Sequence, residues 1–170
     1  MKFFGISGWS GSGKTTLLVK LIPALKEKGL KVSTIKHAHH RFDVDKPGKD
    51  SYRHRDAGAT EVLISSHHRW ALLHELEDEG EPSLQELTAH MSAVDILLVE
   101  GFKSESHVKM EIHRPSVGKP LIAAQDPTIL GVATDEPEII RSMLPDEVVL
   151  LDLNDVAAIA EFVLAKAEPL

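Results

Sequence analysis

Apolar residues along the chain gather in short runs, and these runs alternate with segments in which apolar residues recur at helical spacing. Two runs, Ile96–Val99 and Val148–Leu151, are apolar at every position, which is typical of strands buried on both faces of a parallel sheet. The alternation predicts an α/β fold with a mostly parallel sheet flanked by helices. The expected strands are Phe3–Ser7, Val32–Lys36, Glu61–Ser65, Trp70–Leu73, Ile96–Glu100, Val108–His113, Leu121–Ala124, Ile129–Ala133 and Val148–Leu151.

Helical segments are predicted by spacing and by capping residues. Leucines form one stripe between residues 14 and 28, where Pro23 is expected to kink or interrupt the helix. Residues 106–125 contain apolar runs with no helical segment between them, so we expect an antiparallel extension of the sheet there. Three other helices are expected. One starts at Asp50–Ser51 and ends near Gly58. Another follows Ser83, which forms a capping box with Glu86, and the last follows its cap, Asn154.

The chain has 170 residues, 42% of them hydrophobic, which suits a single domain over residues 1–170 with one sizeable core. No apolar run approaches the roughly 20 residues of a membrane helix, and Met1–Ser7 leads into a glycine-rich loop without a signal-peptide pattern. The lack of cysteine excludes disulfides and thiolate chemistry and fits a reducing compartment. We therefore expect a cytoplasmic protein that contacts no membrane.

Charge divides unevenly along the sequence. Residues 1–73 carry 13 Lys and Arg against 6 Asp and Glu, whereas residues 74–170 carry 6 against 20, and the net charge is −7. A solvated surface explains the acidic second half equally well, but the basic first half suits the collection of phosphates. An overall acidic chain argues against general nucleic-acid binding, which needs a basic face.

The segment Gly8–Thr15 fits the P-loop pattern G-x-x-x-x-G-K-[ST], and it lies between an expected strand and an expected helix. Glycines let backbone N–H groups converge on phosphate oxygens, and the helix N-terminus adds a positive dipole. The lysine then reaches the β- and γ-phosphates, and the Thr15 hydroxyl is expected to bind Mg²⁺. This context disfavours the alternative of a glycine turn with a chance Lys-Thr pair. The expected nucleotide-binding residues are Gly8, Trp9, Ser10, Gly11, Ser12, Gly13, Lys14, Thr15 and Thr16.

Trp9 stands where one class of P-loop protein carries an extra lysine that reaches the nucleotide of a dimer partner. That device is missing from this chain. The indole leaves two interpretations open, a cover over the phosphates or a dimer contact.

A carboxylate, Glu100, ends the apolar run Ile96–Val99. Ligands of open α/β sheets bind at the carboxyl ends of the strands. Glu100 is therefore expected to face Thr15 and the metal, directly or through water, and to be the catalytic residue of any hydrolysis. Gly101 is expected to leave room for the γ-phosphate. The alternative is a carboxylate that only caps a turn.

The segment after the second expected strand is rich in histidine and aspartate. His37, His39 and His40 suggest a transition-metal site only weakly, because their spacing on a loop does not fix a tetrahedron. The aspartates are expected to serve Mg²⁺ or a phosphorylated partner, with simple helix capping by Asp50 as the alternative. They are Asp43, Asp45 and Asp50, of which Asp50 is the predicted metal ligand.

Several specific motifs extend this pattern: Lys36-His37-x-His39-His40, Asp43-x-Asp45-x-Pro47-Gly48-Lys49-Asp50-Ser51, Arg69-Trp70-Ala71-Leu72, Val99-Glu100-Gly101-Phe102-Lys103 and Leu151-Asp152-x-Asn154-Asp155-Val156. With the P-loop and Trp9, they resemble the MobB family of molybdopterin-guanine dinucleotide biosynthesis proteins. The resemblance covers nearly the whole chain. It implies a P-loop NTPase fold and a homodimer that binds GTP with Mg²⁺, hydrolyses it weakly, and assists the guanylyltransferase that attaches GMP to molybdopterin.

Many GTPases read guanine with Asn-Lys-x-Asp, which this chain lacks. Asp135, which follows the run Ile129–Val132, is placed to accept the guanine N1 and N2 hydrogens instead. Asp135 with Glu138 also fits a capping box for the next helix, so capping is the alternative.

Two other functions fit parts of the sequence. A small-molecule kinase would use the same P-loop, but Arg53, Arg55 and Arg69 are too scattered for an arginine-rich lid. A metallochaperone GTPase would use the histidines. The basic residues after the second strand are expected to form a positive concavity for a second anionic ligand, a molybdopterin phosphate or the partner that holds it, with a solubilising loop as the alternative. These residues are Lys36, Arg41, Lys46, Lys49, Arg53 and Arg55.

Overall fold

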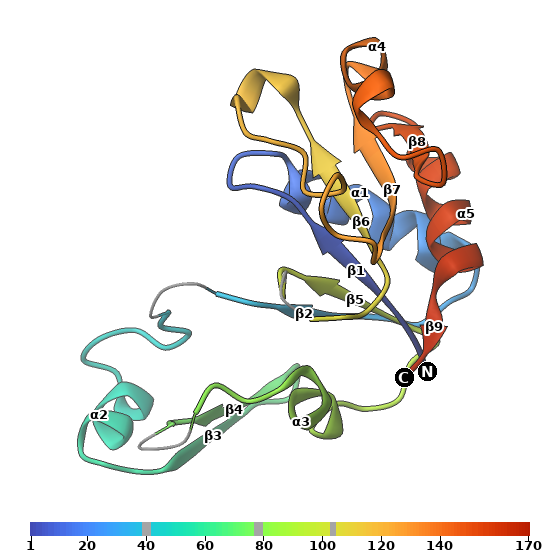
Figure 1. Ribbon diagram of the computed structural model, residues 1–170. Helices are drawn as coiled ribbons and strands as arrows, with labels where there is room; N and C mark the ends of the chain where they lie inside the picture. Colours follow the sequence, from blue (N-terminus) through green and yellow to red (C-terminus); the bar gives the residue numbers. More distant parts are fainter. Residues whose placement is uncertain (39–41, 77–79, 103–104) are drawn as a thin grey trace. The chain divides into compact units, whose positions relative to one another are not determined.

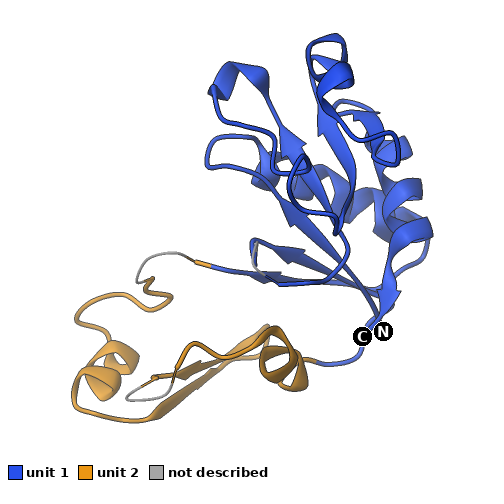
Figure 2. Cartoon of the chain, viewed as in Figure 1, with its two compact units in different colours: residues 1–37, 92–170 blue, residues 38–91 orange. Residues whose placement is uncertain are grey.

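The computed structural model describes residues 1–38, 42–76, 80–102 and 105–170. The chain divides into two compact units, with residues 1–37 and 92–170 in unit 1 and residues 38–91 in unit 2 (Figure 2). The expectation of one nucleotide-binding domain over residues 1–170 stays a prediction.

Unit 1 is built on a mostly parallel sheet with the strand order β2-β5-β1-β6-β7-β8, in which all neighbours run parallel (Figure 1). A short strand, β9, pairs antiparallel with the start of β1. The parallel sheet expected from the apolar runs is confirmed. The strands are β1 (Lys2–Ser7), β2 (Val32–Lys36), β5 (Ile96–Glu100), β6 (Lys109–His113), β7 (Ile129–Thr134), β8 (Val149–Asp152) and β9 (Glu168–Pro169).

Helices α1 (Lys14–Glu27) and α5 (Val156–Lys166) pack together in the main core. Helical spacing places the leucines of α1 on one side of the helix, where they meet apolar side chains of β1 and α5. The described helices include none that is long and apolar enough to cross a bilayer. The main contributors to this core are Phe4, Ile6, Leu17, Leu21, Leu25, Ile159, Phe162 and Val163.

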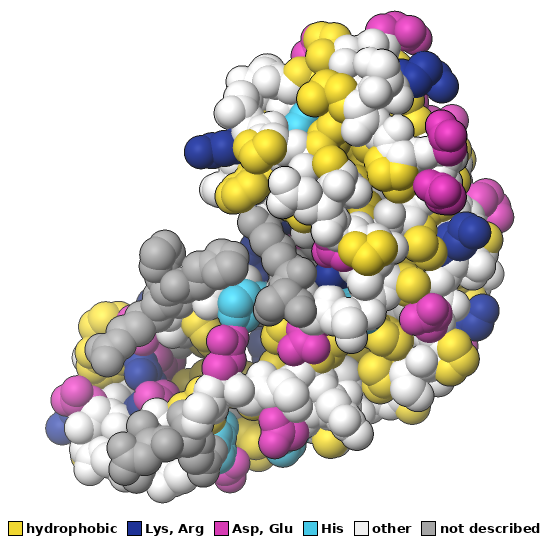
Figure 3. All heavy atoms as spheres, viewed as in Figure 1, with side chains coloured by type: hydrophobic (Ala, Val, Ile, Leu, Met, Phe, Trp, Pro, Cys, Tyr) yellow, Lys and Arg dark blue, Asp and Glu magenta, His cyan; other side chains and the backbone are white. Residues whose placement is uncertain are grey.

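A smaller apolar cluster joins β7 to α4 (Pro137–Ile140), with Ile129, Val132 and Ile140 buried in it. Short 3₁₀ turns, η1 (Pro115–Val117) and η2 (Arg141–Met143), complete the unit. On the face of unit 1 that Figure 3 shows, acidic, basic and apolar side chains are interspersed rather than sorted into one basic surface.

Two helix details differ from the expectation. α1 continues through Pro23 without interruption, and Val19 and Pro23 are both exposed, so solvent can replace the hydrogen bond that the proline removes. The cap of α5 is Asp155, whose side chain accepts a hydrogen bond from the backbone N–H of Ala158 at 2.9 Å. The expected cap, Asn154, lies one residue earlier and is bonded to Asp152 instead.

Residues 106–125 do not form the expected antiparallel extension, because β6 pairs parallel with both β1 and β7 and residues 121–124 form no strand. The reason is Glu111, a buried residue of β6. Its Oε2 accepts hydrogen bonds from the backbone N–H groups of Ile122 at 2.9 Å and Ala123 at 2.8 Å. These groups are therefore not available to pair with a neighbouring strand.

Unit 2 contains an antiparallel pair of strands, whereas the sequence led us to expect antiparallel pairing at residues 106–125. Its two strands form a separate sheet. Ser83 and Glu86 make the expected capping box at the start of α3, and the short helix α2 ends before Gly58 as expected. The elements are α2 (Asp50–Asp56), β3 (Glu61–Ser65), β4 (Trp70–His74) and α3 (Leu84–Ala89).

Candidate nucleotide-binding site

The P-loop connects β1 to α1 over the carboxyl end of β6. Gly8 has φ +140°, and a Cβ there would lie 2.5 Å from the Ile112 carbonyl oxygen, so a side chain is excluded at this position. The Lys14 ammonium donates hydrogen bonds to the carbonyl oxygens of Gly8 and Trp9, both at 2.9 Å. The Lys14 side chain therefore folds back along the loop, so that its ammonium lies where the P-loop motif requires a contact with phosphate.

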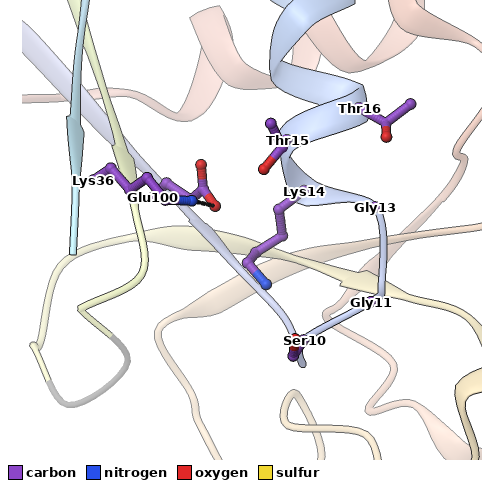
Figure 4. Close-up of a pocket in the computed structure, with 8 residues that line it drawn as sticks. All are labelled: Ser10, Gly11, Gly13, Lys14, Thr15, Thr16, Lys36 and Glu100. Atoms are coloured by element: carbon purple, nitrogen blue, oxygen red, sulfur yellow. Dashed lines mark hydrogen bonds and ion pairs between the residues drawn. The ribbon is translucent and has the colours of Figure 1, made fainter. Parts of the chain in front are cut away.

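A cavity of about 340 Å³ opens beside this loop, and its size is within the range of small-ligand sites. It lies within unit 1 and brings the loop together with the ends of β2 and β5 (Figure 4). The lining residues are Ser10, Gly11, Gly13, Lys14, Thr15, Thr16, Lys36 and Glu100. Six of these were expected from the P-loop motif and one, Glu100, from its place at a strand end.

Glu100 lies where the sequence placed it, at the carboxyl end of β5, and it is only 7% exposed. Thr15 projects from α1 toward it (Figure 4). The Oε1 atom of Glu100 accepts a hydrogen bond from the ammonium of Lys36 at 2.7 Å, and this ion pair was not expected from the sequence. The pair depends on the register of the folded sheet, in which Lys36 and Glu100 are partners at the ends of neighbouring parallel strands.

Gly101 lies against the residue that follows β2, and its expected role of leaving room for the γ-phosphate stays a prediction. It has φ +95°, and a Cβ there would lie 2.8 Å from the Cβ of His37. The glycine thus makes room for His37 after β2, and it does not line the cavity beside the P-loop.

Trp9 contacts another segment of its own chain. Its indole N–H donates a hydrogen bond to the Pro120 carbonyl oxygen at 2.8 Å, and the Lys119 ammonium lies 5.8 Å from the ring centroid. The two interpretations of Trp9, a phosphate cover and a dimer contact, both stay predictions.

Asp135 forms an ion pair in which Arg114 Nη1 lies 3.1 Å from its Oδ2. The expected capping box with Glu138 is not formed, since α4 begins after Glu136 and no side chain of the described residues caps it. The reason is that the N-cap position is Glu136, so Asp135 lies one residue too early to cap α4 and its Oδ2 pairs with Arg114, which follows β6. Arg114 is a lone arginine after a strand and carries no motif, so the sequence gives no reason to expect it in the site.

A row of buried titratable residues lies on β6 and just before it. Burial raises the pKa of Glu111, although hydrogen bonds from Ala123 and Ile122 and the neighbouring His113 oppose this shift. Burial, with the positive charge of Lys109, lowers the pKa of His107 to about 4. These residues support the sheet beneath the P-loop and do not line the cavity.

The described residues contain no cluster of three or more His, Cys, Asp or Glu side chains suited to a metal ion. Of the histidine motif, His37 is described and packs on Phe102, with ring centroids 4.8 Å apart, whereas His39 and His40 lie outside the described residues. Asp50 is exposed at the start of α2 in unit 2. Its expected role as a Mg²⁺ ligand stays a prediction.

The basic segment is partly neutralised within unit 2. Arg55 pairs with Asp43 at 2.8 Å and Asp45 at 2.9 Å, so neither aspartate nor this arginine is a free charge. Arg41 lies outside the described residues. Lys46 and Lys49 are exposed.

A parallel sheet with a P-loop after its central strand is shared by many proteins, and comparison with known proteins decides among them. The sequence model of MobB, molybdopterin guanine dinucleotide synthesis protein B, matches residues 3–135. The chain belongs to the MobB family. The resemblance seen in the sequence motifs is therefore confirmed.

Individual MobB relatives match over nearly the full chain. A molybdopterin-guanine dinucleotide biosynthesis adapter protein of Escherichia coli is 48% identical over 160 residues, which cover 92% of this chain and 88% of that protein. The adapter protein of Haemophilus influenzae is 44% identical over 162 residues, with 94% and 85% covered. A solved structure of molybdopterin-guanine biosynthesis protein B is 27% identical, covers 96% of this chain and 98% of its own, and superposes with a TM-score of 0.71.

Proposed function

We propose that this MobB-family chain binds Mg·GTP at its P-loop and acts as an accessory protein when GMP is attached to molybdopterin. The observation that carries the proposal is the cavity in which Lys14, Thr15 and Glu100 meet at the carboxyl edge of the sheet. Family membership connects that cavity to molybdenum cofactor biosynthesis.

The residues of the cavity fit a nucleotide with Mg²⁺. The Thr15 hydroxyl and the Glu100 carboxylate supply hard oxygen ligands of the kind that Mg²⁺ prefers. The Lys14 ammonium would exchange the two carbonyls of the loop for β- and γ-phosphate oxygens. Mg²⁺ would neutralise phosphate charge, while Glu100 would bind the metal or orient water for a weak hydrolysis.

Asp135, Asp50 and the second anionic ligand are proposed from their positions in the sequence, whereas the homodimer and its partner enzyme are proposed from the family. Asp135 would accept the guanine N1 and N2 hydrogens, and Asp50 would assist with Mg²⁺. The chain would form a homodimer, and this homodimer would act together with the molybdopterin guanylyltransferase. A molybdopterin phosphate would be the second anionic ligand, bound near Lys46 and Lys49.

The accessory role is tested by reconstituting GMP attachment with the guanylyltransferase, molybdopterin and GTP, with and without this protein. Wild-type protein is expected to raise the yield of the guanine dinucleotide, whereas Lys14→Ala protein is not. A yield that is unchanged by wild-type protein, under conditions where GTP binding is saturated, would contradict the accessory role.

A further inference from the structure

The two sides of the P-loop differ in chemistry. In the strand order, β5 and β2 lie on one side of β1, and β6, β7 and β8 lie on the other. Glu100 and Lys36 lie on the first side, and Thr15 projects toward them, whereas Thr16 projects away from them (Figure 4). With metal and terminal phosphate chemistry on the first side, the nucleoside of a bound nucleotide would extend over the ends of β6, β7 and β8.

Arg114 joins the P-loop to this second side. Its Nε would lie 3.4 Å from a Cβ placed on Gly13, and its Nη1 lies 3.1 Å from Asp135 Oδ2. A small cavity of about 20 Å³ lies here, so a nucleoside would lie across its rim and not inside it. The cavity is lined by Gly13, Thr16, Leu17, Lys20, Arg114, Leu153 and Asn154.

The Arg114–Asp135 pair leaves one donor and one acceptor unused. Arg114 Nε and Asp135 Oδ1 are both buried atoms with no hydrogen-bond partner among the described residues. Unpaired buried polar atoms are unfavourable and rare, so both atoms indicate a missing partner. Such a partner must offer an acceptor beside Gly13 and donors beside Asp135.

We propose that Arg114 is the residue that sets guanine selectivity, because it fixes the Asp135 carboxylate with Oδ1 turned to the base. Asp135 then accepts the N1 and 2-amino hydrogens of guanine, while adenine presents an acceptor at N1 and no 2-amino group. Arg114 Nε donates to a nucleotide oxygen beside Gly13. The pair combines, from two strand ends, the cation and the carboxylate that Asn-Lys-x-Asp supplies from one loop. This inference rests on the proposed function, since it requires a purine nucleotide at the P-loop.

The test compares the affinities of GTP, ITP, XTP and ATP by calorimetry, with Mg²⁺ present. ITP keeps N1–H and lacks the 2-amino group, so the GTP-to-ITP ratio reports the contact to Asp135. Arg114→Ala should reduce this ratio and the GTP-to-ATP ratio at least tenfold, and Arg114→Lys should restore part of both. Arg141→Ala, which changes an exposed arginine of η2, is the matched control and should leave both ratios unchanged.

A second variant isolates the carboxylate. Asp135→Asn offers one acceptor and one donor, which matches the N1–H and 2-oxo group of xanthine, so its preference should shift from GTP to XTP. In the Arg114→Ala background this shift should shrink, because the side chain is no longer held in place.

Each outcome supports or overturns the inference. Unchanged ratios in Arg114→Ala protein with a lowered melting temperature would show a structural ion pair only and would overturn it. Wild-type protein that binds all four nucleotides equally would also overturn it, while leaving P-loop nucleotide binding intact. Wild-type protein that binds none of them would refute the proposed function and this inference together.

Discussion

Glu100 and Lys36 meet because each is the last residue of its strand and the two strands are parallel neighbours in register. In this pair, the carboxylate is buried and the ammonium is mostly exposed. Lys36 therefore balances the charge of Glu100 from the solvent side, while Thr15 lies on the α1 side (Figure 4). Metal binding by Glu100 would compete with this ion pair.

Replacing Glu100 by Gln should leave GTP affinity within a few-fold of wild type and lower any GTP hydrolysis at least tenfold. A carboxylate on the metal or on the attacking water acts mainly in the transition state. Single-turnover hydrolysis measures the rate. Asp95→Asn, at the opposite end of β5, is the control and should change neither quantity. Equal hydrolysis by Glu100→Gln and wild-type protein would remove Glu100 from the catalytic site.

His107 should make the fold sensitive to acid. Its pKa falls from 6.5 to about 4 on folding, so between these values the unfolded chain binds more protons than the native one. Its contribution to stability is therefore present above pH 6.5 and is lost as the pH falls to about 4. The loss should reach up to about 3 kcal/mol, since each pKa unit corresponds to roughly 1.4 kcal/mol.

Urea unfolding at several pH values measures this effect, with His107→Phe as the comparison. Neither ring nitrogen of His107 has a hydrogen-bond partner among the described residues, so an apolar ring of similar shape removes only the titration and adds slight crowding. The variant should lose less stability than wild type between pH 6.5 and 4. Parallel stability curves for the two proteins would show that His107 does not titrate in this range.

At the residue scale, sequence reasoning identified the side chains that carry a motif or follow a buried apolar run. The P-loop residues and Glu100 are of this kind. The pairing of Lys36 with Glu100 and of Arg114 with Asp135 was missed because a single cation after a strand has no recognisable pattern. The positions of Lys36 and Arg114 depend on the register between β2 and β5 and on the approach of β6 to the P-loop, and both are tertiary properties.

At the scale of the element, Glu111 decides the structure of the segment that follows β6. Its carboxylate replaces the partner strand that the apolar run Leu121–Ala124 would otherwise need. Sequence patterns gave no sign of this, because an apolar run does not reveal which group will accept its backbone hydrogen bonds. The same segment carries Pro120, whose carbonyl accepts the hydrogen bond from Trp9.

Replacing Glu111 by Ala should lower the free energy of unfolding by about 2 to 4 kcal/mol, since it leaves one buried and one part-buried N–H group without an acceptor. Glu111→Gln keeps an acceptor oxygen and should lose less. Amide hydrogen exchange should become faster at Ile122 and Ala123 in the Ala variant. Glu138→Ala, at an exposed position of α4, is the control. Unchanged exchange at both amides would show that the carboxylate does not hold the segment.

At the scale of the whole molecule, the charge asymmetry of the sequence corresponds only in part to free positive charge. Arg55 is neutralised by Asp43 and Asp45 within unit 2, and Lys36 is neutralised by Glu100 within unit 1. Lys46 and Lys49 remain exposed candidates for a second anionic ligand or partner. Composition alone could not separate these lysines from the cations that are paired.

Neutralising Lys46 and Lys49 together, as Gln, should weaken binding of the guanylyltransferase or molybdopterin and make the remaining affinity less dependent on salt, while GTP affinity changes little. Calorimetry at low and moderate salt measures both. The matched control is the pair Lys26→Gln and Lys31→Gln, two exposed lysines of unit 1. Normal binding of partner and pterin by the Lys46 and Lys49 variant would exclude a second anionic site there.

Nucleotide binding at the P-loop is tested most directly by calorimetric titration of Mg·GTP into wild-type and Lys14→Ala protein, with a thermal melt of each. Lys14 is only partly buried and donates to two carbonyls of its own loop, so its loss should change the melting temperature far less than the GTP affinity. Saturable GTP binding by the wild type and at least a hundredfold weaker binding by the folded variant is the predicted result. Equal GTP affinity in the two proteins, with equal melting temperatures, would contradict nucleotide binding through this loop.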